Sequence, residues 1–467
     1  MSSTTESTAW SWSVEQFGQV DLGDSRRTAR LVQMGAAAYE RPSGKVAAVF
    51  TSDAGREGAY DFLENDAVAV EEIVEGLRRA TAKRCADQPF VFVAVDGTSV
   101  TVTDRAGKKN MGRVGSKANG ARGLKVIDAL AVDSRGTPVG LLGLSWWARG
   151  EQAPLKDHAR QTRPLEERET RHWVETVRQA GDALDERGVR GWFQIDREGD
   201  GRDLLQALQQ TEHWWTVRSN RDRNIELADG DVSKLRSELE QRSMSGLYTL
   251  PVAAHPGRCP REATMVVRVA RVVLRLRDKK NDHITRLEVT AVWAREHGTT
   301  PSNEAPLDWM LYTNRPVETL DDALMVVWGY SQRWRVEEFH KTWKAGDCDI
   351  ESSQLESPEA LERWGTILAA TAVRIERLKR LAREHPDTPA SIELSPYELC
   401  ALKTLRFGAN PPNPQPTIAQ AVSWLAELGG FANKYSGKPP GATVLGRGIK
   451  YLRSAARILE LQHGYEK

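Results

Sequence analysis

The sequence has few cysteines, no long apolar run and almost no net charge. Its four cysteines are far apart and form no C-x-x-C pair: Cys85, Cys259, Cys348 and Cys400. This spacing argues against a structural zinc site and a disulfide framework, and it fits a reducing cytoplasm. No window approaches the roughly 18 apolar residues of a membrane span, and the first residues lack the basic and apolar regions of a secretory signal. We therefore expect a cytoplasmic protein without a membrane partner.

The formal net charge is only +1, so the overall composition gives no indication of a nucleic-acid partner. Two segments are nevertheless basic. Residues 105–125 hold seven basic residues and no acidic one, and residues 396–467 hold nine basic and four acidic residues. Such local excess is what contact with phosphate requires, although a solvated loop and a basic tail would show the same composition.

The hydrophobic pattern indicates helical ends around a strand-rich middle. Residues 1–70 indicate short helices, with Asp24 as the N-cap of one over residues 25–40 and a second over residues 54–65. The middle predicts strands over 89–96, 191–196, 213–219 and 307–313, a hairpin over 123–147, helices over 165–187 and 199–212, and a β-rich insertion over 222–303. One long helix is expected over 319–344, and the Pro-rich segment 408–416 precedes a C-terminal helical unit. This order predicts a mixed α/β sheet with helices packed on it.

Two aspartates stand at the ends of predicted strands, where ligand sites of open α/β sheets commonly lie. They are Asp96, after residues 89–95, and Asp196, after residues 191–195. Phosphoryl-transfer enzymes that use two hard cations need carboxylates that converge from separate elements. Together with Glu337 on the long helix, the two aspartates would meet that need. Each residue also has a simpler interpretation: a turn for Asp96, a solvated helix start for Asp196 and a surface charge for Glu337.

The face of the long helix favours the functional interpretation of Glu337. Each residue of an α-helix advances by about 100° around the axis. On this basis four residues share one arc of about 60° on the helix surface: Tyr330, Arg333, Glu337 and Lys344. Lys341 lies at the edge of this arc. Glu338 falls well off this stripe. A carboxylate flanked by cations and a phenol is what a face that binds a metal ion and phosphates requires.

These four residues reproduce the Y-(2)-R-(3)-E-(6)-K signature of bacterial insertion-sequence transposases. The chain resembles the DDE cut-and-paste transposases of the IS-four group, such as the Tn-five transposase. Shorter similar runs follow in the same order along nearly the whole chain: LGDSRRTARL at 22–31, REGAYDFLEN at 56–65, VDGTS at 95–99, IDREGD at 195–200, TVRSN at 216–220, PLDWMLYT at 306–313 and AELGGF at 426–431.

The resemblance implies a ribonuclease-H-like (retroviral-integrase-like) catalytic core over residues 71–380, with the β subdomain inserted at about 222–303. It also implies a helical DNA-end-binding domain over 1–70 and a helical dimerisation domain over 381–467. In such an enzyme Asp96, Asp196 and Glu337 would hold two Mg²⁺ or Mn²⁺ ions. Its partners would be double-stranded DNA, as terminal repeats and target, and a second copy of the chain in a synaptic homodimer associated with the bacterial nucleoid.

The resemblance also assigns DNA contacts by position. Four residues are expected to hold the DNA backbone near the scissile bond: Tyr330, Arg333, Lys344 and Arg218. Lys341 is expected to contact the DNA less closely. Trp309 would stack on a flipped base, and the inner part of the terminal repeat would be bound by Arg26, Arg27 and Arg30. A core tryptophan and a solvated basic face remain the alternatives for these last two groups.

The implied function is excision of a mobile element. Water cuts one strand, the freed 3′-OH attacks the opposite strand to give a hairpin, and the reopened 3′ ends join target DNA. Two alternatives stay open: a non-catalytic DNA-binding protein derived from a transposase, and a structure-selective ribonuclease-H-like nuclease. The presence of all three acidic residues favours the enzyme. The dimer contact is expected in the C-terminal unit, whose apolar positions exceed what two short helices can bury: Val422, Leu425, Leu428, Phe431, Leu452, Ile458 and Leu459.

Overall fold

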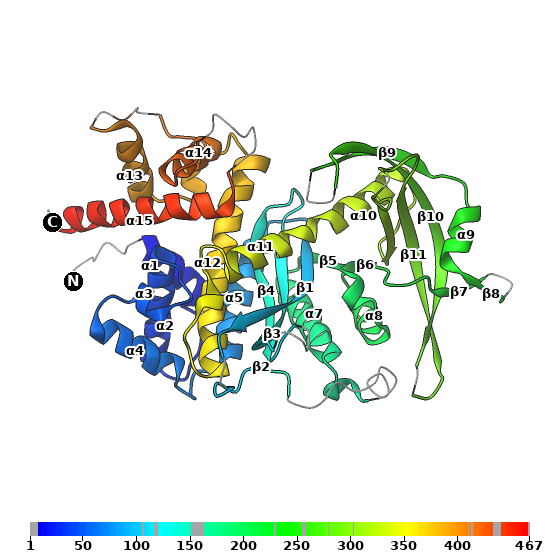
Figure 1. Ribbon diagram of the computed structural model, residues 1–467, viewed down its shortest axis with the longest axis horizontal. Helices are drawn as coiled ribbons and strands as arrows, with labels where there is room; N and C mark the ends of the chain where they lie inside the picture. The colour runs from blue at the N-terminus through cyan, green and yellow to red at the C-terminus, as the bar shows by residue number, and fades with distance from the viewer. Residues whose placement is uncertain are drawn as a thin grey trace. The chain divides into compact units, whose positions relative to one another are not determined.

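The structure, a computed structural model, describes residues 8–104, 107–115, 120–150, 163–227, 230–254, 258–278, 280–301, 303–409, 411, 414–432 and 440–465. The chain forms two compact units that alternate along the sequence (Figure 1). Unit 1 comprises Met1–Gln88, Gly97–Glu151 and Arg335–Lys467, and unit 2 comprises Pro89–Asp96 and Gln152–Trp334. Both units combine helices with strands, which confirms the predicted α/β class. Within the described ranges, no helix combines the length and hydropathy that a membrane span requires.

Unit 1 is mainly helical. Its N-terminal part contains α1 (Thr8–Phe17), α2 (Ser25–Glu40), α3 (Val46–Val49), α4 (Asp53–Leu63) and α5 (Val70–Cys85). Its C-terminal part contains α11 (Trp334–Lys344), η4 (Ile350–Ser352), α12 (Pro358–Glu384), η5 (Ala390–Ile392), α13 (Pro396–Phe407), α14 (Ile418–Leu428) and α15 (Ala442–Tyr465). Asp24 caps α2 as predicted, because its side chain accepts a hydrogen bond of 2.8 Å from the Arg26 backbone N–H.

Helix α12 forms the centre of unit 1. It packs against α2, α5, α14, α15 and one strand, β4 (Pro138–Trp147), and nearly all of its residues between Ala360 and Leu381 are buried. Its Trp364 is fully buried and donates from Nε1 to the carbonyls of Ser43 and Gly44. The N-terminal helices therefore share one core with helices that lie more than 300 residues later in the chain.

The strands of unit 1 include the predicted hairpin. β3 (Arg122–Val132) pairs antiparallel with β4, and the short β2 (Gly112–Arg113) extends β3 on its other side. β1 (Phe90–Val102) begins in unit 2 and ends in unit 1. The prediction that this strand ends at Asp96 is wrong. The residues after Gly97, TSVTV, are mostly β-branched, and such side chains favour continued strand pairing.

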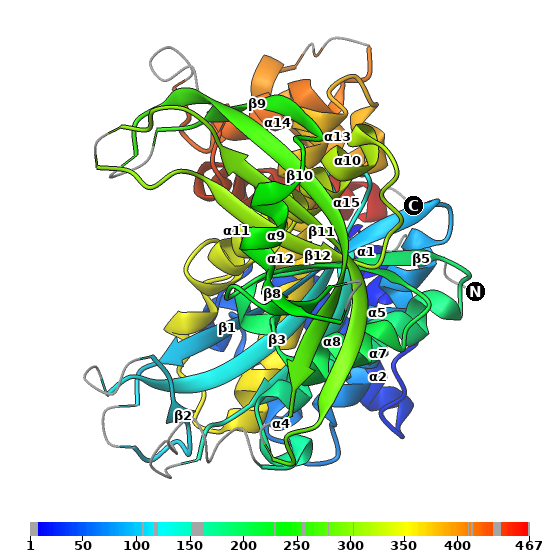
Figure 2. The ribbon, with the colours of Figure 1, turned by 90° about the vertical axis from the view of Figure 1, so that its right-hand side faces the viewer.

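Unit 2 is built around a mixed sheet. The first part of β1, which belongs to unit 2, pairs in parallel with β5 (Arg190–Ile195). Strand β5 in turn pairs in parallel with β6 (Trp214–Arg218). The antiparallel strands that follow β6 are β12 (Asp308–Thr313), β11 (Ile284–Glu296) and β10 (Arg261–Arg277). β10 also pairs with β7 (Asn224–Glu226) and β9 (Gly246–Val252), and β7 pairs with β8 (Val232–Lys234). Figure 2 shows β10 and β11 as a long twisted hairpin, inside the segment 222–303 where the sequence predicts β structure.

The helices of unit 2 are α7 (Thr170–Asp185), α8 (Arg202–Gln209), α9 (Leu235–Gln241) and α10 (Leu320–Gln332), with η2 (Leu165–Glu167) and η3 (Arg197–Gly199). The single helix predicted over 319–344 is wrong, because α10 ends before Arg333 and α11 begins after it. The Arg333 N–H donates to the Tyr330 carbonyl, three residues back, at 3.1 Å. This tight turn interrupts the α-helical ladder.

The apolar surface expected on the C-terminal unit is partly buried. Val422, Leu425 and Leu452 are buried, because α14 and α15 pack on each other and on α12. The prediction of unburied apolar surface is therefore wrong for these three residues. Ile458 is exposed on α15 together with Tyr451, and the remaining predicted positions are half-buried: Leu428, Phe431 and Leu459.

Candidate active site

Asp96 and Asp196 occupy neighbouring positions in unit 2. Val95 on β1 is in register with Ile195 on β5, and these two strands run parallel. Asp96 directly follows Val95, and Asp196 directly follows Ile195. The two aspartates therefore lie side by side just after the last paired residues of β1 and β5, with their backbones one strand spacing, about 4.8 Å, apart. The same register places both side chains on the same face of the sheet. The structure thus brings together two of the three carboxylates chosen from the sequence.

The two carboxylates have different surroundings. Asp96 is 8% exposed and accepts a hydrogen bond of 2.7 Å from Nη1 of Arg333. Asp196 is half-buried and caps η3, accepting a hydrogen bond of 2.7 Å from the Glu198 backbone N–H. An arginine ion pair stabilises the charged form of Asp96, and the backbone bond fixes the direction of the Asp196 carboxylate. Both carboxylates are therefore held in fixed directions by their hydrogen bonds.

Tyr330, Arg218 and Arg333 surround these aspartates within unit 2. Tyr330 is 3% exposed, and its side chain is hydrogen-bonded to Arg218. Burial raises the pKa of Tyr330, while Arg333 and Arg218 lower it and Asp196 raises it further. The electrostatic influence of all three groups shows that the phenol, both cations and the carboxylate form one cluster. The sequence signature had grouped Tyr330 with Arg333, and the resemblance had added Arg218.

Trp309 lies beside the same cluster. Its ring is 5.8 Å from the Tyr330 ring in an edge-on arrangement, and Arg218 donates to the carbonyl of the preceding Asp308 at 3.0 Å. Trp309 is half-buried, whereas Trp293 on the neighbouring strand is 1% exposed and belongs to the core. Trp309 is therefore less enclosed than Trp293, and its stacking on a flipped base stays a prediction.

Glu337 lies on α11 in unit 1 and is half-buried. Because the helix is broken at Arg333, helical periodicity places Glu337 on a common face only with other residues of α11. Among these, Lys341 is exposed, and Lys344 is half-buried with Nζ 3.5 Å from Glu351. A role of Glu337 as the third metal ligand stays a prediction.

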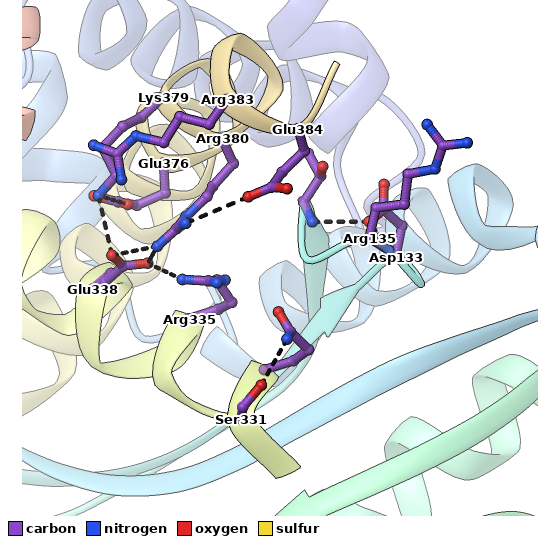
Figure 3. Close-up of polar contacts among 12 residues, drawn as sticks. Asp133, Arg135, Ser331, Arg335, Glu338, Glu376, Lys379, Arg380, Arg383 and Glu384 are labelled. Atoms are coloured by element: carbon purple, nitrogen blue, oxygen red, sulfur yellow. Dashed lines mark hydrogen bonds and ion pairs between the residues drawn. The ribbon is translucent and has the colours of Figure 1, made fainter. Parts of the chain in front are cut away.

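Glu338, the neighbour of Glu337, is held by three cations of unit 1 (Figure 3). Its carboxylate accepts hydrogen bonds from Arg380 at 2.6 Å and from Arg335 at 2.9 Å, and Nζ of Lys379 lies 3.9 Å away. Burial alone would raise the pKa of Glu338, but these cations lower it to about 2. A carboxylate so engaged anchors α11 to α12, which supports Glu337 rather than Glu338 as the functional carboxylate.

His340 provides a second anchor of α11. Its Nε2 lies 2.6 Å from Oδ2 of the fully buried Asp128 on β3. Burial raises the pKa of Asp128, and His340 counteracts that effect. The sequence analysis missed this pair, whose members are 212 residues apart. The one available signal was an aspartate within the otherwise apolar strand VIDALAV.

No three His, Cys, Asp or Glu side chains are grouped so as to hold a metal ion in the part of the chain that the structure describes. The predicted pair of metal ions therefore stays a prediction. The chemistry of the donors is nonetheless appropriate, because Asp96 and Asp196 offer carboxylate oxygens at adjacent strand ends, and Mg²⁺ and Mn²⁺ prefer oxygen ligands.

The three arginines predicted to bind DNA ends lie in the first turns of α2. The Arg26 side chain is 90% exposed and pairs with Asp24 at 2.8 Å. This pairing lowers the pKa of Asp24 to about 2. Arg27 donates to the carbonyl of Leu22 at 2.9 Å, and Arg30 lies over α4. Arg26 is thus the most accessible of the three.

The basic segment 105–125 is partly described. Arg105 and Lys117 lie outside the described residues. Lys109 donates to the Leu355 carbonyl at 3.0 Å, Arg122 to the Met111 carbonyl at 3.0 Å and Lys125 to a serine hydroxyl at 3.1 Å. The acceptors of these three hydrogen bonds are neutral oxygens.

Residues 9–68 match the family model described as transposase DNA-binding. This segment contains α2 with Arg26, Arg27 and Arg30, so the match falls on the part of the chain for which the sequence analysis predicts DNA-end binding. The match supports a transposase with DNA as its partner, and it indicates a DNA-processing enzyme.

Proposed function

We propose that this chain is a DDE cut-and-paste transposase that binds the terminal repeats of a mobile element, excises it through a hairpin intermediate and joins its 3′ ends to target DNA. The adjacency of Asp96 and Asp196 carries the proposal. Two acidic side chains at the ends of neighbouring parallel strands, surrounded by Arg218, Arg333 and Tyr330, suit a reaction at an anionic phosphodiester. The transposase DNA-binding match supports the substrate class.

Asp96, Asp196 and Glu337 would hold Mg²⁺ or Mn²⁺ in a ribonuclease-H-like core. The bound ions would supply the charge stabilisation that phosphodiester hydrolysis and transesterification require. The ion pair between Asp96 and Arg333 at 2.7 Å holds this carboxylate in one orientation. It also keeps a guanidinium beside the position that a scissile phosphate takes.

The remaining residues bind and orient the DNA. Arg218 is fixed by the Asp308 carbonyl and by Tyr330, so its guanidinium is preorganised for a backbone phosphate. Trp309 offers a half-exposed ring on which a displaced base stacks during hairpin formation. Lys344 and the exposed Lys341 add positive charge on α11. A homodimer brings two element ends together, with its contact on α15.

The test is cleavage of DNA that carries the element's own ends, with Mg²⁺ or Mn²⁺. The wild-type chain should release the element, whereas Asp96→Asn, Asp196→Asn and Glu337→Gln should each bind the ends in a gel shift and cut them more than about 100-fold more slowly, since several kcal/mol of charge stabilisation are lost. Specific binding without any cutting by the wild type would establish the non-catalytic alternative. Cutting of branched DNA regardless of the end sequence would establish the nuclease alternative.

A further inference from the structure

Arg453 on α15 is a buried cation without a hydrogen-bonded partner. It is 4% exposed, and its Nε, Nη1 and Nη2 have no hydrogen-bond partner among the described residues. The guanidinium lies 4.1 Å from the ring centre of Tyr39 on α2. Burial and the neighbouring Arg374 lower the pKa of Arg453 to about 10, so the group stays charged at neutral pH.

A second guanidinium shares the same ring. Arg374 on α12 lies 4.2 Å from the centre of Tyr39. The Tyr39 hydroxyl donates to Glu398 on α13 at 2.8 Å, and Glu398 lies 3.5 Å from Arg374. Its other carboxylate oxygen accepts the backbone N–H of Ser395 at 3.0 Å. Two buried positive charges thus face one carboxylate that already has three partners.

Asp347 is the other acidic group that influences Arg453, and it forms no ion pair with it within 4.0 Å. Asp347 is 8% exposed, and its carboxylate lies against Gly446 of α15. The Oδ2 atom of Asp347 has no hydrogen-bond partner among the described residues. Burial raises its pKa to about 6, although Lys450 and Arg453 oppose the effect. Asp347 and Glu398 offset the charges of Arg453 and Arg374, but neither carboxylate is hydrogen-bonded to Arg453.

The unpaired guanidinium of Arg453 calls for a hydrogen-bond acceptor. A buried charge that lacks hydrogen bonds is strongly unfavourable, and the faces of aromatic rings compensate for only part of the lost hydration. Three unpaired guanidinium nitrogens form a fork that suits one compact acceptor. A neighbouring pocket of about 780 Å³ in unit 1 has Tyr39 and Arg374 in its wall.

We propose that Arg453 binds a small inorganic monoanion of the halide class, in a site completed by Tyr39 and Arg374. Chloride is a compact anion that accepts hydrogen bonds and donates none, which suits a guanidinium with no acceptor of its own. The site joins α2, which belongs to the segment matched by the DNA-binding family model, to α12, α13 and α15. Chloride then stabilises the packing of the DNA-binding segment on the C-terminal helices. This effect is opposite in sign to the general weakening of DNA binding by salt.

The test is thermal unfolding of the full chain while chloride replaces gluconate at constant ionic strength. The wild type should show a saturable rise in melting temperature of roughly 2–4 °C, and Arg453→Met should show none. Arg457→Met is the matched control, because Arg457 is exposed one turn further along α15 and pairs with Glu460 at 3.3 Å. It should respond to chloride as the wild type does.

Crystals of the wild type grown with bromide provide a test that needs no variant. An anomalous peak within hydrogen-bonding distance of the Arg453 guanidinium is the expected result. Ordered water alone at that position, or a wild-type melting temperature that is the same in chloride and gluconate, would overturn the proposal. If Arg453→Met does not fold, the bromide position decides.

Discussion

Replacing Glu338 by Gln should destabilise unit 1 while leaving the chemistry of the candidate site intact. The carboxylate is shared by Arg380 and Arg335, with Lys379 nearby. The glutamine has nearly the same shape but no charge, so three cations lose their common counter-ion. Burial already lowers the pKa of Arg335, and Arg380 lowers it further, so their mutual repulsion would then be offset less, with Glu384 remaining 3.7 Å from Arg380.

The magnitude follows from the pKa of Glu338, which falls from 4.5 to about 2 in the folded chain. At 1.36 kcal/mol per pKa unit this corresponds to about 3 kcal/mol of stability. The Glu338 side chain is 31% exposed to solvent. Screening by solvent therefore reduces the expected loss of stability to about 2 kcal/mol. Because the folded-state pKa is lowered, this contribution is fully present above pH 4.5 and is lost as the pH falls towards 2.

The assay is urea unfolding of the wild type, Glu338→Gln and the matched control Glu337→Gln at pH 7 and at pH 4. At pH 7 Glu338→Gln should be less stable by about 2 kcal/mol, and the difference from the wild type should shrink at pH 4. Glu337→Gln should still fold and should abolish cleavage. If folded Glu338→Gln lost cleavage while Glu337→Gln kept it, the assignment of the two carboxylates would be refuted.

Three further predictions concern DNA and the dimer. Joint replacement of Arg26, Arg27 and Arg30 by Ala should lower the salt dependence of binding to element ends by roughly one counter-ion per lost contact. An equal loss from a triple Ala variant at the exposed Arg271, Arg277 and Arg286 would indicate mere charge reduction. Trp309→Ala should leave first-strand nicking intact and slow hairpin formation by roughly 5- to 150-fold, the equivalent of about 1–3 kcal/mol of stacking; a collapsed melting temperature would instead show a core role. Tyr451→Glu with Ile458→Glu should give a monomer by light scattering with end DNA, and a dimer that persists would place the contact elsewhere.

Local signals predicted the elements whose structure depends on nearby residues. Asp24 directly precedes an amphipathic run, so its capping role follows from the sequence. The β3–β4 hairpin follows from two apolar runs around a short turn. The end of β1 was misplaced because Asp96 and Gly97 also form a common turn dipeptide. The break at Arg333 could not be predicted because arginine is equally compatible with a continuous helix.

For the candidate site, strand order made Asp96 and Asp196 recognisable as neighbours before the register was known. The anchors of α11 were not recognisable, since His340 pairs with a residue 212 positions earlier and Glu338 depends on cations from α12. Tyr39 was missed for the same reason. Its partners come from three helices of the last hundred residues, and no periodicity in α2 indicates them.

The alternation of the two units along the chain has a consequence for biosynthesis. Unit 2 is complete in sequence once residue 334 has been made, whereas unit 1 needs residues of α15. The polypeptide leaves the ribosome from its N-terminus, so Tyr39 emerges more than 300 residues ahead of Arg374, Glu398 and Arg453. During that interval the apolar face of α2 has no α12 to cover it. The first-made helices of the chain therefore reach their final packing only when translation is nearly finished.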